Sequence, residues 1–170
     1  MEIALLPKSG IRIKGKKATI AVDSTDKVVY EAVLALAKSA EEVIVPDESV
    51  LIFSVGEFEV GGIKITGIRS EAGRMIYSAL VDGISILIGG LNALEKTHSK
   101  LQEHDIVVVD CEEEGSSSFV ASLASNVVVF YGPHAAITSS AFGKDAVKIQ
   151  NKYSNTKDKL PIELETVLLG

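Results

Sequence analysis

The sequence predicts an α/β fold, or the related α+β layering, with a mixed sheet or a pair of mixed sheets and helices outside them. Two observations favour it. Residues 1–90 carry short apolar runs separated by tight turns, which is typical of hairpins, whereas the order after residue 90 is strand, helix, strand. No linker or repeat interrupts the 170 residues, so we expect a single domain over residues 1–170.

The first forty residues combine strands with one expected helix. Apolar residues alternate in three runs separated by turns, at residues 2–6, 11–14 and 18–22. From Asp26 onward the period changes, because Val29, Val33 and Leu36 recur at three- and four-residue spacing. Ser24, Thr25 or Asp26 is available as the N-cap. This spacing predicts an amphipathic helix over residues 26–39.

The middle of the chain returns to strand composition. β-Branched and aromatic residues fill four short runs between Pro- and Gly-containing turns, at residues 43–45, 50–53, 58–60 and 63–68. Two longer apolar runs flank Asp82-Gly83, the dipeptide that supplies the positive φ angles of a two-residue turn. We therefore expect a hairpin formed by residues 75–81 and 84–88.

The second half alternates helices with strands. Helices are expected at residues 92–102 and 116–125, and buried strands at residues 106–109 and 127–131. The tail adds a short helix at residues 139–143 and short strands at residues 146–149 and 166–169. Since hairpins come before this alternation, a single-wound parallel sheet fits the whole chain poorly.

Composition and charge exclude several classes of protein. Hydrophobic residues make up 46% of the chain, yet the longest apolar runs fall far short of the ~20 residues that cross a bilayer. The N-terminus has no basic region ahead of a long apolar stretch, so we expect no signal peptide and a cytoplasmic protein. The net charge is −6 and no Lys/Arg cluster interleaves with aromatic residues, so we expect neither nucleic acid nor membrane as a partner.

Cys111 is the single cysteine of the sequence. One cysteine excludes an internal disulfide and a thiolate-rich zinc site. We expect Cys111 to be a small buried apolar residue and not a nucleophile.

Several phrases in a fixed order resemble the small metallo-β-lactamase-fold proteins described as zinc-dependent hydrolases, akin to the ascorbate-phosphate lactonase branch. The strongest is GEFEVGGIKITGI at residues 56–68, which is similar to the family's GEYEVxGVxVTGI hairpin. Weaker matches cover nearly the whole chain, at residues 13–23, 75–84, 103–109 and 159–168. The resemblance implies a shortened αββα sandwich of two mixed β-sheets with outer helices.

The departures from that family concern its zinc ligands. The family's His-x-His-x-Asp-His loop would follow residues 43–45, where this sequence reads Pro-Asp-Glu-Ser, and its bridging aspartate would follow residues 84–88, where this sequence reads Gly-Gly-Leu-Asn-Ala. Glu71 stands where a further histidine is expected, so His134 alone corresponds to a family ligand. Zinc needs three or four converging ligands. We therefore expect no metal ligands and no cofactor, although zinc is typical of the family.

Four residues are candidates for a cleft that the resemblance implies, with no catalytic role assigned to any. Asp23 ends a strand at the edge of the expected cleft, where it could bind a ligand. In the alternative interpretation it caps the expected helix. Glu71 lies in a loop with Arg74, with which it forms a surface ion pair in the alternative interpretation. Asp110 follows a buried strand at its carboxyl end, where α/β sheets place ligand sites. His134 follows the next strand.

Three functions remain open on this sequence. The first is a catalytically inactive or altered metallo-β-lactamase-fold protein that binds a small ligand or a protein, or associates with itself. The second is a hydrolase with a non-standard mononuclear or metal-free site built from the four candidates, which requires converging geometry. The third is a structural or assembly subunit, favoured by the apolar composition, which would form a homo-oligomer.

Overall fold

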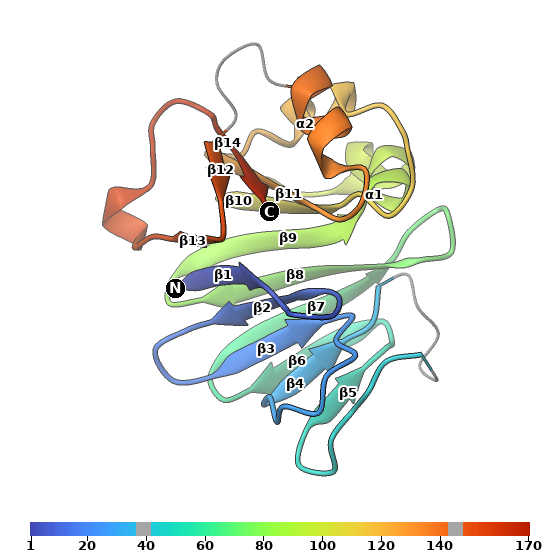
Figure 1. Cartoon of the computed structure of the whole chain (residues 1–170), viewed down its shortest axis with the longest axis vertical. Coiled ribbons are helices and arrows are strands. Elements are labelled where there is room, and N and C mark those ends of the chain that lie inside the picture. Colours follow the sequence, from blue (N-terminus) through green and yellow to red (C-terminus); the bar gives the residue numbers. More distant parts are fainter. Residues whose placement is uncertain (37–41, 143–147) are drawn as a thin grey trace.

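The computed structural model describes residues 1–36, 42–142 and 148–170. Two sheets pack face to face, and the helices gather on the outer side of one of them (Figure 1). The predicted α/β class with two mixed sheets is confirmed. In the described part of the chain no helix is long and apolar enough to span a membrane.

The first sheet is six-stranded and holds most of the N-terminal residues. In spatial order the strands are β13 (Lys152–Ser154), β1 (Glu2–Leu5), β2 (Ile11–Lys14), β3 (Thr19–Val22), β4 (Ala32–Leu34) and β5 (Val50–Ile52). The neighbours β1, β2 and β3 pair antiparallel, and the neighbours β3, β4 and β5 pair parallel.

The second sheet is eight-stranded and changes from antiparallel to parallel pairing at its centre. The hairpin strands are β6 (Gly56–Val60), β7 (Ile63–Arg69), β8 (Met75–Val81) and β9 (Ile84–Gly90). The parallel strands that follow in space are β10 (Ile106–Asp110), β11 (Val127–Tyr131), β14 (Glu165–Leu169) and β12 (Lys148–Gln150). The Asp82-Gly83 turn between β8 and β9 has φ angles of 53° and 81°, which confirms the predicted hairpin.

Short helices cover the outer face of the second sheet. They are α1 (Leu91–Thr97), α2 (Ala135–Phe142) and the 3₁₀ turns η1 (His98–Lys100) and η2 (Ser118–Leu123), with a further turn, η3 (Lys157–Lys159), in the tail. Leu94 of α1 and Phe119 of η2 pack on the outward side chains of the sheet, such as Val107 and Phe130. The helix expected over residues 116–125 is therefore a shorter 3₁₀ helix, which ends at Ala124 with a φ of 48°.

The helix expected over residues 26–39 is wrong for residues 26–36, and its end lies outside the described residues. Asp26 instead accepts hydrogen bonds from the Val28 N–H and the Tyr30 hydroxyl, forming a turn, and β4 then pairs with β3. Ala32 and Leu34 face the central core while Val33 faces outward and is also buried. A strand buried on both faces reads as a continuous apolar run, which imitates helical spacing.

The strand expected at residues 43–45 is also wrong, because this segment forms no ladder. Val43 is buried against the outer face of the first sheet, and Ile44 donates its N–H to the Ser24 carbonyl at 3.0 Å. In the described residues this sheet face is therefore covered by loops.

Tyr77 joins the two sheets across the core. Tyr77 belongs to β8 of the second sheet. Its hydroxyl lies 3.0 Å from the carbonyl of Ala35, which directly follows β4, and 2.8 Å from the carbonyl of Ile52, the last residue of β5. The single O–H donates between these two acceptors. Burial raises the pKa of Tyr77, so its hydroxyl stays a donor.

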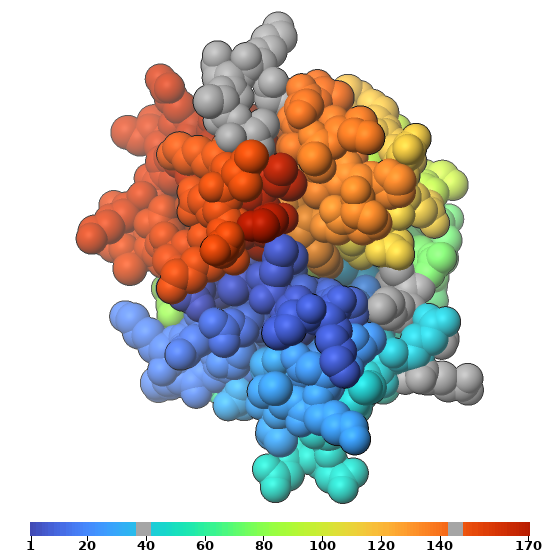
Figure 2. Space-filling model, in the orientation of Figure 1, coloured from blue at the N-terminus to red at the C-terminus, as the bar shows by residue number. Residues whose placement is uncertain are grey.

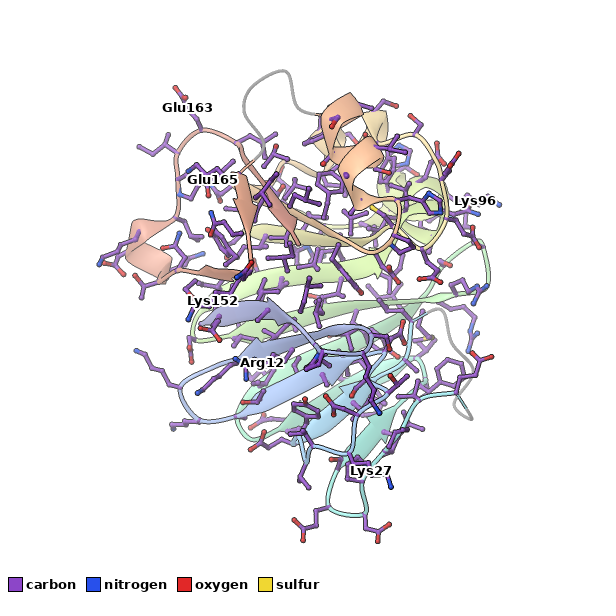
Figure 3. The ribbon with its side chains drawn as sticks, in the orientation of Figure 1. Arg12, Lys27, Lys96, Lys152, Glu163 and Glu165 are labelled. Atoms are coloured by element: carbon purple, nitrogen blue, oxygen red, sulfur yellow. The ribbon has the colours of Figure 1, made fainter. Side chains whose placement is uncertain are left out.

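The N-terminal strand lies beside a strand from the C-terminal part of the chain. β1 pairs with β13, and Glu2 bonds Lys152 at 2.9 Å and Arg12 at 3.1 Å. Figure 2 shows the blue N-terminal residues against the red C-terminal ones on one face, and Figure 3 shows Arg12 and Lys152 on this side of the molecule.

Candidate functional site

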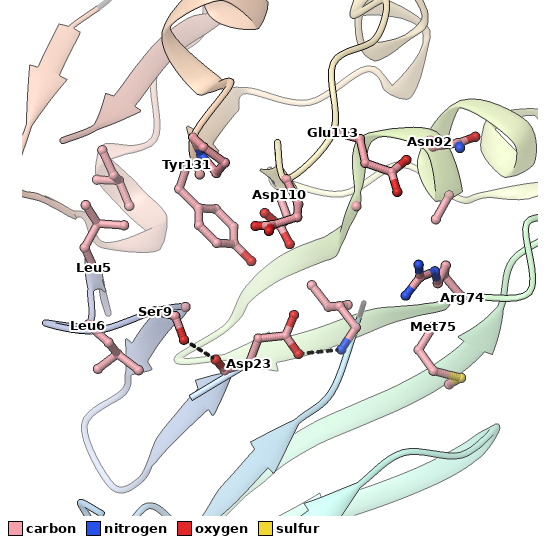
Figure 4. A pocket seen from close by; sticks show the side chains of 18 of the residues that line it. Leu5, Leu6, Ser9, Asp23, Arg74, Met75, Asn92, Asp110, Glu113 and Tyr131 are labelled. Atoms are coloured by element: carbon pink, nitrogen blue, oxygen red, sulfur yellow. Dashed lines mark hydrogen bonds between the residues drawn. The ribbon is translucent and has the colours of Figure 1, made fainter. Parts of the chain in front are cut away.

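A cleft of about 1070 Å³ opens between the two sheets where several strands end. Gly90, Asp110 and Tyr131 are the last residues of β9, β10 and β11, and they lie in register across these parallel strands. Asp23, directly after β3, approaches them from the first sheet (Figure 4). The cleft therefore lies at the carboxyl ends of the strands, the usual place of a ligand site in such sheets.

The floor of the cleft consists of Asp23, Asp110 and Tyr131. Their exposed fractions are only 5%, 7% and 4%. Figure 4 shows the Tyr131 hydroxyl directed toward the space between the two carboxylates. Two buried carboxylates beside a phenol form a polar centre in an otherwise apolar interior.

Asp23 has a left-handed backbone conformation, with a φ of 48°. Its carboxylate oxygen Oδ1 accepts the Leu36 N–H at 2.9 Å, and its own N–H bonds the Leu34 carbonyl at 2.9 Å. The expectation that Asp23 caps a helix is therefore wrong, because it holds the end of β4. A positive φ at a residue other than glycine is strained, and such strain is common at functional sites.

The Tyr131 hydroxyl is buried and has no hydrogen-bond partner among the described residues. Burial raises the pKa of Tyr131 well above its ordinary value, and the charges of Asp110 and Asp23 raise it further. The phenol therefore stays protonated and can both donate and accept. An unpaired buried hydroxyl costs about 1–3 kcal/mol, so it needs an explanation.

Gly132 permits the close approach of the chain to this floor. Its φ is +104°, and a Cβ there would lie 3.1 Å from the Asp110 Oδ1. Glycine is the residue that adopts this conformation without penalty. The turn after β11 thus lies directly on the Asp110 carboxylate.

The walls of the cleft differ in character. Leu5, Leu6, Pro133 and Leu169 give one wall an apolar surface. Polar and charged side chains line the other parts of the cleft. They are Arg74 from the β7–β8 loop, Asn92 and Lys96 from α1, Glu112 and Glu113 after β10, and Lys8 from the β1–β2 turn. Figure 4 shows Leu5 and Leu6 opposite Arg74 and Asn92, with the acidic floor between them.

The structure brings together Asp23 and Asp110 but not all four predicted residues. Glu71 lies outside the cleft lining and pairs with Lys100 at 2.6 Å; this ion pair lowers the pKa of Glu71. His134 directly follows Gly132 and Pro133, which line the cleft, but it is not a lining residue itself. Its Nδ1 lies 3.4 Å from the Glu114 Oε1. The carboxyl-end position predicted for Asp110 is confirmed by its place at the end of β10.

Tyr131 is the central residue that the sequence analysis does not single out. It appears there only as the end of an apolar strand, although its register beside Asp110 would follow from parallel pairing of the two strands. Cys111 is fully buried as predicted, and burial raises the pKa of its thiol to about 12. A thiol of this kind is unreactive at neutral pH.

The fold can be compared with solved structures. A Thermotoga maritima protein assigned to the metallo-β-lactamase superfamily as a zinc-dependent hydrolase gives a TM-score of 0.73 at 18% identity, over 98% of this chain and 97% of its own. The metallo-β-lactamase fold protein YhfI from Bacillus subtilis gives 0.56 at 8% identity, over 98% and 95% of the two chains. No protein-family profile matches the chain, and no curated protein matches its sequence.

This chain has the metallo-β-lactamase fold. A third neighbour, a metal-dependent hydrolase from Parabacteroides distasonis, agrees with a TM-score of 0.58 at 10% identity, over 82% of this chain and 86% of its own. Two of the three neighbours are thus described as metal-dependent. Whether this metallo-β-lactamase-fold cleft can bind zinc depends on the ligand atoms that its side chains offer.

The described donors do not fit a zinc site. Across residues 1–36, 42–142 and 148–170, no three His, Cys, Asp or Glu side chains group closely enough to hold a metal ion. Asp23 uses one carboxylate oxygen on the Leu36 N–H, and the Nδ1 of His134 faces Glu114. Zinc needs three or four converging ligands before it can activate water.

Proposed function

We propose that this protein binds a small polar ligand in the cleft and does not carry out zinc-dependent hydrolysis. The observation that carries the proposal is the Tyr131 hydroxyl, which is buried between Asp110 and Asp23 and has no hydrogen-bond partner in residues 1–36, 42–142 and 148–170. Buried polar groups are nearly always hydrogen-bonded, and exceptions concentrate at sites where a ligand or water completes the bonding.

The size and lining of the cleft support this proposal. A volume of about 1070 Å³ is at the upper end of small-molecule sites. Such sites combine apolar walls with a few fixed polar groups, and here Leu5 and Leu6 provide a wall while Asp110 and Tyr131 provide polar groups.

The hydrolase alternative requires Asp23, Glu71, Asp110 and His134 to converge. Glu71 and His134 do not line the cleft, so these four residues do not form the converging site that this alternative requires. Binding without turnover is the function that the geometry supports best.

The test is isothermal titration calorimetry with three probes of different charge, namely spermidine, sorbitol and citrate. We expect at least one probe to bind the wild-type protein. Its affinity should fall about threefold to tenfold in Tyr131→Phe, the loss expected for one hydrogen bond. Tyr153→Phe is the matched control, because Tyr153 is equally buried but lies outside the cleft lining. Failure of all three probes to bind would overturn the proposal.

A further inference from the structure

Tyr77 is a core residue that does not line the cleft. Its side chain is fully buried, and its hydroxyl donates between the carbonyls of Ala35 and Ile52. Burial raises the pKa of Tyr77, and the charge of Asp23 raises it further. The phenol therefore keeps its proton and offers the Ala35 carbonyl a permanent donor.

The Ala35 carbonyl and the Leu36 N–H belong to one peptide group. A peptide group is planar, so a contact that fixes its oxygen also fixes the direction of its N–H. The Leu36 N–H donates to the Asp23 Oδ1 at 2.9 Å, and both Leu36 and Asp23 line the cleft. A peptide relay, formed by Tyr77, the Ala35–Leu36 peptide group and Asp23, thus joins the core to the cleft floor.

The two hydrogen bonds of this peptide group support each other. A donor on the carbonyl oxygen and an acceptor on the N–H polarise the group in the same sense, and buried chains of hydrogen bonds are cooperative. The exposed fractions of Asp23, Ala35 and Leu36 are 5%, 0% and 2%, so water competes little with either bond. Loss of the Tyr77 hydroxyl should therefore also weaken the bond between Leu36 and Asp23.

The conformation of Asp23 makes its supporting contacts important. Its φ of 48° is strained for a residue other than glycine, and such strain persists where the surroundings fix it. The Leu34 carbonyl accepts the Asp23 N–H at 2.9 Å, and the Ser9 hydroxyl donates to the Asp23 carbonyl at 3.1 Å. These contacts hold the main chain, whereas the Leu36 N–H contacts the carboxylate itself (Figure 4). Tyr77 therefore acts on the cleft through Leu36.

We propose that Tyr77 is a positioning residue of the cleft, whose hydroxyl fixes the Asp23 carboxylate through the Ala35–Leu36 peptide group. The consequence for ligand affinity rests on the proposed function, whereas the effect on Asp23 is a property of the free protein. The role involves no covalent step.

The test measures the amide proton chemical shift of Leu36 by NMR, which moves upfield when its hydrogen bond weakens. We expect an upfield shift in Tyr77→Phe, which keeps the ring and removes the donor. Replacement of Tyr77 by 4-aminophenylalanine, whose N–H is a weaker donor, should give a smaller shift in the same direction. This second variant keeps a donor in place, so it decides the question if Tyr77→Phe does not fold.

Two further variants separate positioning from a general loss of stability. Asp105 directly precedes β10 and bonds Ser85 near the start of β9, at the ends of these strands opposite the cleft, so Asp105→Asn should leave the Leu36 shift unchanged. Asp23→Asn keeps an acceptor oxygen and tolerates the left-handed backbone but carries no charge. The shift caused by Tyr77→Phe should be clearly smaller in the Asp23→Asn background, because the peptide relay then ends on a weaker acceptor.

Two results would overturn the positioning role. The first is a Leu36 shift that does not move in Tyr77→Phe, or moves as much in Asp105→Asn. The second is an equal effect of Tyr77→Phe with and without Asp23→Asn, which would show that the hydroxyl acts on the main chain alone. Circular dichroism and urea unfolding check that each variant folds.

Ligand affinity is measured on the same variants by calorimetry with spermidine, sorbitol and citrate. A probe that binds the wild-type protein should bind Tyr77→Phe about threefold to tenfold more weakly and Asp105→Asn equally well. Unchanged affinity in Tyr77→Phe would overturn the role of Tyr77 in binding. If no probe binds, the proposed function fails, while the Leu36 shift still decides whether Tyr77 positions Asp23.

Discussion

At the scale of single residues, two buried tyrosines provide a direct comparison. The Tyr77 hydroxyl contacts two main-chain carbonyls, whereas the Tyr131 hydroxyl has no partner among the described residues. Both rings pack in the same central core. The substitution Tyr→Phe removes the same atom at both positions, so its effect isolates the hydrogen bonding of each hydroxyl.

We predict opposite effects of the two substitutions on the free energy of unfolding. Tyr77→Phe should lower it by about 1–3 kcal/mol, because two buried carbonyls lose their donor. Tyr131→Phe should leave it unchanged or raise it by up to about 1–2 kcal/mol, because an unpaired hydroxyl is removed. Urea unfolding in ligand-free buffer measures both. A loss of stability in Tyr131→Phe similar to that in Tyr77→Phe would mean that the hydroxyl is bonded in the free protein.

The residue scale also shows what sequence can and cannot predict about the site. Asp110 is predictable, since an acidic residue directly after a buried strand lies at the carboxyl edge of a parallel sheet. Tyr131 is harder to predict, because its importance depends on the register that places it beside Asp110. The left-handed backbone of Asp23 depends on the pairing of β3 with β4, a contact that local spacing does not reveal.

At the scale of elements, long hairpins are predictable and short buried strands are not. The β8–β9 hairpin follows from its turn dipeptide, whereas β4 has three residues and is buried on both faces, so its composition does not distinguish it from a helix. Tertiary pairing decides the conformation of such a segment.

Asp105 links three elements and makes a prediction about pH. Asp105 directly precedes β10. Its carboxylate accepts hydrogen bonds from the N–H and the hydroxyl of Ser85 in β9, and it pairs with Lys157 of η3 at 2.6 Å. Burial raises the pKa of Asp105, but Lys157 and Ser85 outweigh it, and the folded pKa lies below the ordinary value. As the pH falls, Asp105 is therefore protonated in the unfolded chain before it is protonated in the folded chain. The stabilisation that its carboxylate provides is lost as the pH falls from about 4 through the folded pKa.

We predict that Asp105→Asn lowers the free energy of unfolding by about 1 kcal/mol at pH 7. The difference from wild type should shrink as the pH falls below about 4, where the wild-type carboxylate also becomes neutral. Urea midpoints at several pH values measure this effect, with the exposed Glu163→Gln as control. A difference that is constant with pH would show that the ionised carboxylate contributes nothing.

At the scale of the whole molecule, the two-sheet architecture follows from the order of hairpins and alternating elements. The fold class is confirmed, yet the fold does not determine the function, because function depends on the residues at the cleft. In the part of the chain that the structure describes, the cleft has buried acids and a phenol without a hydrogen-bond partner, and no histidines converge there.

Self-association remains an alternative at this scale, and the mass in solution tests it. A binding module that works through its own cleft is expected to be monomeric, with a mass of 18.0 kDa. Light scattering after size-exclusion chromatography at several protein concentrations measures the mass. A stable multiple of 18.0 kDa would favour the assembly subunit instead.

Metal content tests the central claim most directly. Protein purified without chelator is measured by elemental mass spectrometry before and after dialysis against excess zinc, and each sample is assayed for phosphodiesterase and lactonase activity. We predict far less than one zinc per chain and no turnover, because the described donors do not converge. Near-stoichiometric zinc together with turnover would contradict this account and would identify the cleft as an active metal centre.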